Sequence, residues 1–294
     1  EVLMRLVIRM LPLVLSLLAA GMSAASPGTG LLYGTTRAND LITINPVTGA
    51  PTLVGNMGSG PMPALAVSPA SGVIYSGTGA GSPLVFTLSP ATGFATLLGN
   101  SGLGFSAISS FDFGPGGILY ASVNIVNDGG SGGDNLATIN LVTGAATVIG
   151  SYGLCGPAGC ALEGMEAIAF DLAGTLYGAT ANGTNPPALY TINTATGQAT
   201  VVAPILTAAG AAPGGGISAL AFSCDGTLYA GTARTQGGAD GGVFGTLNKV
   251  TGLFSPIGQT IADRSSLLDL SFQAGCGVVK TRPSTWGRVK SIYR

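Results

Sequence analysis

One short turn motif recurs five times along this chain of 294 residues. Each copy reads Asn-x-x-Thr-Gly, with Ser in place of Asn once, and the glycines are 44 to 55 residues apart. An apolar run rich in β-branched residues precedes each turn and another follows it, which is typical of a β-hairpin. The sequence therefore predicts five copies of one hairpin, with turns at 45–49, 89–93, 140–144, 193–197 and 248–252.

A second hairpin precedes four of these copies. In each of them an apolar strand ending in Val or Phe leads through a glycine-containing turn into Ile-Tyr or Leu-Tyr, over 64–75, 110–120, 167–177 and 219–229. Each copy therefore contains four strands, and four-stranded units of about 40 to 50 residues are typical of β-propeller blades. One tyrosine recurs at the same place, which predicts that these side chains pack between blades: Tyr33, Tyr75, Tyr120, Tyr177 and Tyr229.

The two ends of the repeat region complement each other. The first copy begins at Leu32-Tyr33 without a leading strand, and an additional strand, 268–272, follows the fifth hairpin. If that strand joins the first copy, the ring closes without an exposed sheet edge at the join. We therefore predict an all-β fold over residues 26–276, a five-bladed β-propeller of four-stranded blades in which the C-terminal strand closes the first blade.

The N-terminal segment has the layout of a secretory signal peptide. Arg5 and Arg9 precede an apolar run over 10–20, and small residues for cleavage lie at 23–25. The apolar run is shorter than the ~20 residues that a membrane-spanning helix needs. We expect residues 1–25 to be removed and the mature protein to be secreted or held at the cell surface, and an uncleaved anchor is the alternative.

The C-terminal tail, residues 277–294, differs in charge from the repeats. It carries five basic residues and no acidic one, whereas residues 26–276 carry 4 basic and 11 acidic residues. The single tryptophan, Trp286, lies in this tail, and a basic segment with an aromatic residue can dock on a surface. Attachment of the protein to a surface and an unstructured basic end are both open interpretations of the tail.

Four cysteines in an exported chain point to disulfides. Cys155 and Cys160 bracket a short loop, and Cys224 and Cys276 each follow the innermost strand of a blade. Because those two blades become neighbours when the ring closes, we predict the pairs Cys155–Cys160 and Cys224–Cys276. A zinc site made by all four thiolates is the alternative, although the spacing is not that of two CxxC pairs.

The composition excludes several classes of function. The chain has no histidine, so it cannot build a Ser-His-Asp or Cys-His mechanism or a histidine-bound zinc site. Only 8% of its residues are charged and the formal net charge is −1, which argues against nucleic acid as a partner. The chemistry left to an enzyme is that of carboxylates, a bound metal or a lysine.

Four carboxylates fall on or just before the predicted innermost strands: Asp112, Glu163, Glu166 and Asp269. At a central channel they could converge and bind a ligand, or they could form a solvated channel lining. Asp128 and Asp134 flank a glycine-rich loop and could supply oxygens to Ca²⁺, although the spacing is not that of an EF-hand and a flexible polar loop is the alternative. We assign no catalytic residue and expect no cofactor, with Ca²⁺ as the one candidate.

The order of the strands separates two faces of the ring. The turns inside the hairpins lie on one face, which we call the turn face, and connections of different lengths lie on the other, the loop face. Variable loops on a rigid scaffold are a usual place for binding. We therefore expect a protein or a surface glycan to bind the loop face or the central channel, and we leave self-association open.

The tandem pattern Phe-x-x-x-Gly-x-Leu-Tyr-Gly/Ala, followed by Thr-Ile-Asn-x-x-Thr-Gly-x-x-Thr, resembles secreted bacterial propeller repeats of the quinoprotein-like and YncE-like kind. The resemblance concerns structural positions, so it implies the blade fold but no chemistry. The segment 162–166 is similar to calcium-dependent gluconolactonase-like propellers, although the histidine that some of these lactonases use is absent. We expect a secreted, non-catalytic binding or structural module, and the alternative is a calcium-assisted hydrolase or lactonase-like enzyme with Glu166 as ligand or base.

Overall fold

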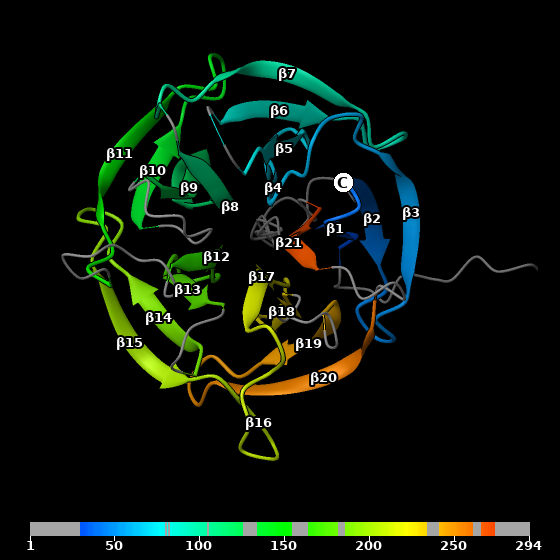
Figure 1. Cartoon of the computed structure of the whole chain (residues 1–294), viewed down its shortest axis with the longest axis vertical. Coiled ribbons are helices and arrows are strands. Elements are labelled where there is room, and N and C mark those ends of the chain that lie inside the picture. Colours follow the sequence, from blue (N-terminus) through cyan, green and yellow to red (C-terminus); the bar gives the residue numbers. More distant parts are fainter. Residues whose placement is uncertain are drawn as a thin grey trace, which may run out of the picture.

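The computed structural model describes residues 30–79, 81, 83–104, 106–125, 134–154, 164–181, 186–233, 241–260 and 266–273. These residues form five sheets, antiparallel apart from one short edge strand, arranged as blades around a central axis (Figure 1). In this part of the chain the helical structure is one 3-10 turn, Pro115–Gly117, and no helix is long and apolar enough to cross a membrane. The segments 1–25 and 277–294, interpreted above as a signal peptide and a tail, lie outside the described residues.

The strands of each blade follow one another from the axis outward. Blade 1 contains β21 (Leu267–Phe272), β1 (Leu32–Thr36), β2 (Asp40–Ile44) and β3 (Pro51–Asn56), and blade 2 contains β4 (Ala64–Val67), β5 (Ile74–Gly77), β6 (Leu84–Leu88) and β7 (Ala95–Asn100). Blade 3 contains β8 (Ala107–Phe113), β9 (Leu119–Asn124), β10 (Asn135–Ile139) and β11 (Ala146–Ser151), and blade 4 contains β12 (Met165–Phe170), β13 (Leu176–Thr180), β14 (Ala188–Ile192) and β15 (Ala199–Pro204). Blade 5 contains β17 (Ile217–Phe222), β18 (Leu228–Thr232), β19 (Val243–Leu247) and β20 (Leu253–Gln259), with a short additional strand, β16 (Leu206–Thr207), at its outer edge.

The C-terminal strand closes the ring. β21 pairs antiparallel with β1, so that Leu32 lies opposite Phe272 and Gly34 lies opposite Leu270. The side chains of Leu270 and Phe272 belong to a buried apolar cluster that also contains Leu32 and Ile44. The predicted five-bladed, all-β propeller with its first blade completed by the C-terminal strand is confirmed.

Aromatic side chains join neighbouring blades near the axis. The tyrosine on the second strand of one blade packs against the phenylalanine that ends the innermost strand of the next blade, with ring centroids 5.1 to 5.8 Å apart. The pairs are Tyr75–Phe113, Tyr120–Phe170, Tyr177–Phe222 and Tyr229–Phe272. In the remaining seam Tyr33 shares an apolar cluster with Val67, which stands where the other blades have phenylalanine. The predicted packing of the tyrosines between blades is confirmed.

The Asn-x-x-Thr-Gly motif builds the outer turn of each blade. Oδ1 of Asn45 accepts hydrogen bonds from the N–H groups of Val47 and Thr48, at 2.9 and 3.2 Å. Asn140 and Asn248 make the same two contacts. The glycine has φ between +71° and +82° in all five turns, a region that residues with a side chain rarely adopt. The turn itself therefore requires the motif.

A second glycine, in the outermost strand, lets neighbouring blades meet at their outer edges. Gly99 of β7 lies so close to the outer turn of blade 3 that a methyl group on it would overlap the carbonyl oxygen of Thr143. This approach brings the N–H of Ala146 to 2.8 Å from the carbonyl oxygen of Ser101, which is a backbone hydrogen bond between blades. The same close approach joins Gly55 to Thr92, Gly150 to Thr196 and Gly258 to Thr48.

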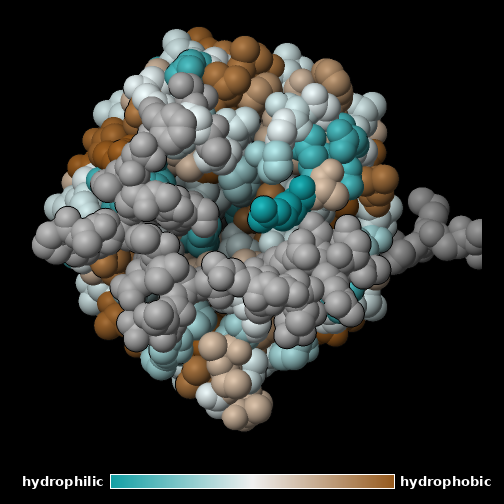
Figure 2. Space-filling model, in the orientation of Figure 1, coloured by the Kyte–Doolittle hydropathy of each residue, from teal (hydrophilic) through white to brown (hydrophobic). Residues whose placement is uncertain are grey.

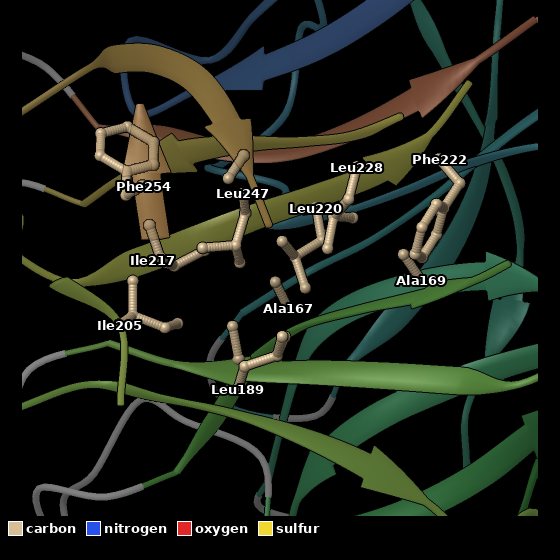
Figure 3. Packing of buried hydrophobic residues seen from close by; sticks show 12 residues of the cluster. Ala167, Ala169, Leu189, Ile205, Ile217, Leu220, Phe222, Leu228, Leu247 and Phe254 are labelled. Atoms are coloured by element: carbon tan, nitrogen blue, oxygen red, sulfur yellow. The ribbon is translucent and has the colours of Figure 1, made fainter. Parts of the chain in front are cut away.

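The seam between blades 4 and 5 departs from this pattern. Blade 4 has Ala203-Pro204 near the end of its outermost strand, and the chain continues through Ile205 into β16, which pairs in parallel with β20. Ile205 is buried in an apolar cluster that also contains Leu189 and Phe254, from blades 4 and 5 (Figure 3). The sequence did not predict β16, which reinforces this seam from outside.

The outermost strands present apolar side chains to solvent. Leu53, Leu97 and Val201 are 57 to 64% exposed, and apolar patches lie along the rim of the ring (Figure 2). The strands β3, β7, β11, β15 and β20 contain no charged residue. The low charge of the composition is therefore a property of the rim as well as of the core.

We expect Gly99→Ala to destabilise the fold by more than about 2 kcal/mol, because the added methyl group must push blades 2 and 3 apart and break the hydrogen bond between Ala146 and Ser101. Gly60 is the matched control, since a methyl group on it has open space. Gly60→Ala should change the free energy of unfolding by no more than about 0.5 kcal/mol. Urea unfolding of both variants tests this, and equal stabilities would contradict the role of the seam.

Deletion of the chain from Leu268 onward should expose the edge of β1 and the apolar cluster around Leu32. Because an open propeller presents an unpaired edge, we expect aggregation or loss of cooperative unfolding. A shorter deletion of residues 277–294 is the control and should leave the melting temperature unchanged. Size-exclusion chromatography and thermal melting of both variants test this. If the protein that lacks the chain from Leu268 onward is monomeric and has an unchanged melting temperature, closure of the ring by β21 is refuted.

Candidate functional site

The innermost strands β21, β4, β8, β12 and β17 surround the axis (Figure 1). Because side chains alternate along a strand, the positions one and three residues before the terminal Val or Phe share one side of it. Both positions are alanine in β4, β12 and β17. They are Ser110 and Asp112 in β8, and Asp269 and Ser271 in β21. Two of the five blades therefore place polar side chains at these positions.

Asp269 is fully buried, with 0% of its surface exposed. Its Oδ2 accepts hydrogen bonds from the N–H groups of Leu65 in blade 2 and Phe111 in blade 3, at 2.8 and 3.2 Å. Its Oδ1 accepts one from the N–H of Leu270 at 2.9 Å, and the Ser110 hydroxyl bonds to the same carboxyl group. Burial raises the pKa of Asp269 well above its ordinary value, and the hydrogen bonds oppose the rise. One carboxyl group therefore ties together the innermost strands of three blades.

Two serines bridge innermost strands in the same manner. Oγ of Ser271 in blade 1 accepts a hydrogen bond from the N–H of Val67 in blade 2, at 3.0 Å. Oγ of Ser110 in blade 3 accepts one from the N–H of Ile168 in blade 4, at 3.1 Å. An innermost strand has no further strand beside it, so these side chains supply acceptors for backbone groups along its inner edge.

Asp112 makes the corresponding bridge nearer to solvent. Its Oδ2 accepts a hydrogen bond from the N–H of Phe170 in blade 4 at 2.6 Å, and its Oδ1 accepts one from the N–H of Phe113 at 2.8 Å. The residue is half-buried. Burial raises the pKa of Asp112 to about 7, while the two backbone hydrogen bonds act to lower it. Its carboxyl group therefore changes ionisation near neutral pH.

A cavity of about 400 Å³ lies beside Asp112, at the turn-face end of the axis. Its wall consists of the ends of the innermost strands and the turns that follow them, and it includes Phe113, Phe170, Phe222 and Phe272. Polar side chains on the wall are Asp112, Asp171, Ser271 and Gln273. An apolar wall with a few polar groups and this volume is typical of a small-molecule site.

An ion pair marks one side of this cavity. Asp171 follows β12 in blade 4, and its Oδ2 lies 2.9 Å from Nζ of Lys249 in the outer turn of blade 5. The same Nζ lies 5.6 Å from the ring centroids of Tyr177 and Phe222. Burial acts to raise the pKa of Asp171, but the hydrogen bond and charge of Lys249, together with two backbone hydrogen bonds, lower it below its ordinary value. The hydrogen bond to Asp171 raises the pKa of Lys249. The sequence alone does not indicate that these two residues pair, although Lys249 is the one lysine in the five outer turns.

The four carboxylates of the predicted channel site do not meet at one point. Asp112 and Asp269 both accept hydrogen bonds from innermost strands, but Asp269 lies deeper. Glu166 lies near the loop-face start of β12, where the register shifts between Met165 and Ala167. Glu163 lies outside the described residues. The carboxylates are therefore spread along the axis, and the cavity opens at the turn face rather than among the variable loops.

The predicted calcium and disulfide residues fall largely outside the described residues, as Asp128, Cys155, Cys160 and Cys276 do. Asp134 is buried, and its Oδ1 accepts hydrogen bonds from the N–H of Ile125 and from Nδ2 of Asn135. Within the described ranges no three His, Cys, Asp or Glu side chains form a group that could hold a metal ion. Cys224 is disulfide-bonded, and its pairing with Cys276 stays a prediction.

We expect Asp269→Ala to destabilise the protein by about 2 to 4 kcal/mol, because the N–H groups of Leu65 and Phe111 lose their acceptor in a buried place. Ser271→Ala removes one acceptor and should cost about 1 kcal/mol. Since the pKa of Asp269 is raised in the folded protein, its contribution to stability is largest below pH ~4 and declines as the pH rises. The side chain in Asp269→Asn cannot ionise, so the free energy of unfolding of this variant, measured with denaturant, should decline less between pH 4 and pH 8 than that of the unchanged protein. An equal decline in both proteins would contradict the assignment.

Comparison with protein-family models finds no match for this chain, and comparison with curated proteins finds none either. Solved structures do resemble it. One from a crystal of a nidogen and laminin complex has a TM-score of 0.52 at 14% identity, over 84% of this chain and 98% of that one. A protein of unknown function from Bacteroides thetaiotaomicron has a TM-score of 0.50 at 16% identity, over 86% of this chain and 66% of that one.

A third similar structure is the PQQ-bound form of an aldose sugar dehydrogenase from Streptomyces coelicolor, with a TM-score of 0.43 at 14% identity, over 78% of this chain and 80% of that one. At these identities the likeness concerns the fold, and a shared fold does not transfer an activity. The chain is a five-bladed β-propeller built from repeats, which is the fold that the resemblance of its motifs implies.

Proposed function

We propose that this chain is a non-catalytic binding module that works outside the cell or at its surface. The observation that carries the proposal is the use of the axial carboxyl groups. Asp269 accepts hydrogen bonds from three backbone N–H groups, and Asp112 accepts two. Three of these contacts join one blade to another. The two groups therefore serve the ring itself before they could serve a reaction.

Lys249, the one lysine among the residues that the structure describes, is not an activated nucleophile. A lysine that forms a Schiff base or acts as a base needs a lowered pKa. The ion pair with Asp171 instead raises the pKa of Lys249. With no histidine in the chain, this observation supports binding rather than catalysis.

The partner that we propose is a protein or a surface glycan at the loop face. The turns of the other face repeat one motif in every blade, whereas the connections of the loop face differ in length and sequence. A rigid ring that presents variable connections is suited to recognition. The signal-like segment 1–25 supports a location outside the cell, and the basic tail 277–294 would attach the module to a surface.

One observation favours the alternative of a calcium-assisted hydrolase. Burial raises the pKa of Asp112 to about 7, and a general base is most effective when its pKa lies near the working pH. In that enzyme a calcium ion bound to axial carboxylates, with Glu166 as ligand or base, would activate the substrate. The two functions differ in whether the native state binds calcium.

We expect a chelator to leave the melting temperature of the full chain within about 1 °C, because a binding module without calcium has no bound metal to lose. If the native state bound calcium, a free Ca²⁺ concentration of about a hundred times the Kd would add ~2.7 kcal/mol to the free energy of unfolding, which thermal melting detects easily. The melting temperature of Glu166→Gln should then equal that of the unchanged protein, both with Ca²⁺ and without it. A clear drop on chelation that Ca²⁺ restores, and that Glu166→Gln abolishes, would favour the hydrolase.

A further inference from the structure

The cavity at the turn face has a chemical character that binding at the loop face does not explain. Four phenylalanines, from β8, β12, β17 and β21, contribute to its wall. Its acidic groups are Asp112 and Asp171, and no lysine or arginine belongs to its described wall. The cavity is therefore apolar on its sides and acidic at two points.

The two acidic groups differ in their partners. Asp171 is neutralised by Lys249 at 2.9 Å. Within the described residues no lysine or arginine lies within ion-pair distance of Asp112. A half-buried carboxylate without a counter-charge is costly, since backbone hydrogen bonds replace only part of its hydration. A cation in the cavity would supply the missing charge.

The protein already holds one ammonium group by the same chemistry. Nζ of Lys249 bonds to the carboxylate of Asp171 and lies over the rings of Tyr177 and Phe222. A carboxylate beside an aromatic pair is thus an ammonium site in the seam between blades 4 and 5. Asp112 lies beside the pair Tyr120 and Phe170 in the seam between blades 3 and 4, and that seam has threonine where blade 5 has Lys249.

We propose that the turn-face cavity binds a small organic cation, a primary ammonium group on an apolar body, with the ammonium at Asp112 and the body against the phenylalanines. A volume of about 400 Å³ accommodates a ligand of this kind. The free oxygen lone pairs of Asp112 accept hydrogen bonds from the ammonium, and Ser271 and Gln273 lie on the same wall. This site is separate from the loop face, so it does not depend on the function proposed above.

The test uses the full chain at pH 8 and three probes of one shape: benzylammonium, benzyl alcohol and benzoate. We expect benzylammonium to bind at least about tenfold more tightly than benzyl alcohol in calorimetry, and benzoate not to bind, because only the ammonium pairs with Asp112. The amide NMR signals of Phe113 and Phe170 should shift on addition of benzylammonium. Equal binding of the ammonium and the alcohol would overturn the proposal.

Asp112→Asn should remove the preference for the ammonium over the alcohol. The matched control is Asp40→Asn, which removes the same charge at the start of β2, outside the cavity wall. An equal loss in both variants would show general attraction by the acidic body and would refute the site. If Asp112→Asn does not fold, Ala221→Met fills the cavity with Asp112 intact, and benzylammonium binding that survives this change refutes the proposal as well.

Acid should weaken the binding, because a protonated Asp112 has no charge to pair. Burial raises the pKa of this group to about 7, so the affinity for benzylammonium should fall about tenfold from pH 8 to pH 6. The other titratable groups on the strands packed against β8, or directly after them, are Tyr75, Tyr120, Glu166, Asp171 and Asp269. The pH dependence should vanish in Asp112→Asn, and its persistence there would assign it to one of these groups and overturn the role of Asp112.

Discussion

The contact between the outer edges of neighbouring blades depends on glycine at two places at once. The glycine of the outer turn has a positive φ, and the glycine of the outermost strand has no room for a methyl group. Only together do they let the backbones come close enough for one hydrogen bond, such as that from Ala146 to Ser101. The recurrence of Thr-Gly along the chain is therefore a packing requirement of the ring, and four of the five seams combine it with the strand glycine, the exception being the seam between blades 4 and 5.

The inner edges of the blades lack a neighbouring strand, whereas the outer edges meet closely. Each innermost strand turns an edge toward the axis, where no further strand can pair with it. Blades 1 and 3 meet this need with Asp269, Ser271, Ser110 and Asp112, which accept hydrogen bonds from the next blade. Blades 2, 4 and 5 have alanine at these positions. The ring is nearly symmetric outside and asymmetric at its axis, and the cavity therefore has a carboxyl group, Asp112, on one side of its wall.

Most of the fold could be predicted from the sequence because each blade repeats the same local signals. The turn motif, the tyrosine and the additional strand at 268–272 each imply a contact that the structure contains. Strand β16 could not be predicted, since two residues that pair in parallel leave no periodic pattern. The ion pair of Asp171 and Lys249 joins two blades through turns, and the residues that meet across a seam follow from the geometry of the ring rather than from their spacing in the chain.

The candidate site was harder to locate because residue type alone does not place a carboxylate along the axis. Asp112 and Asp269 lie on equivalent strands only two positions apart, yet one reaches the cavity and the other is enclosed by backbone amides. A shift of two residues toward the turn face changes the carboxyl group from a link between blades to one that also meets solvent. The variable loops favour the loop face as a binding surface, but the carboxyl group without a counter-charge lies at the other end of the axis. There Asp112 lies beside Tyr120 and Phe170, and among the described residues no lysine joins them.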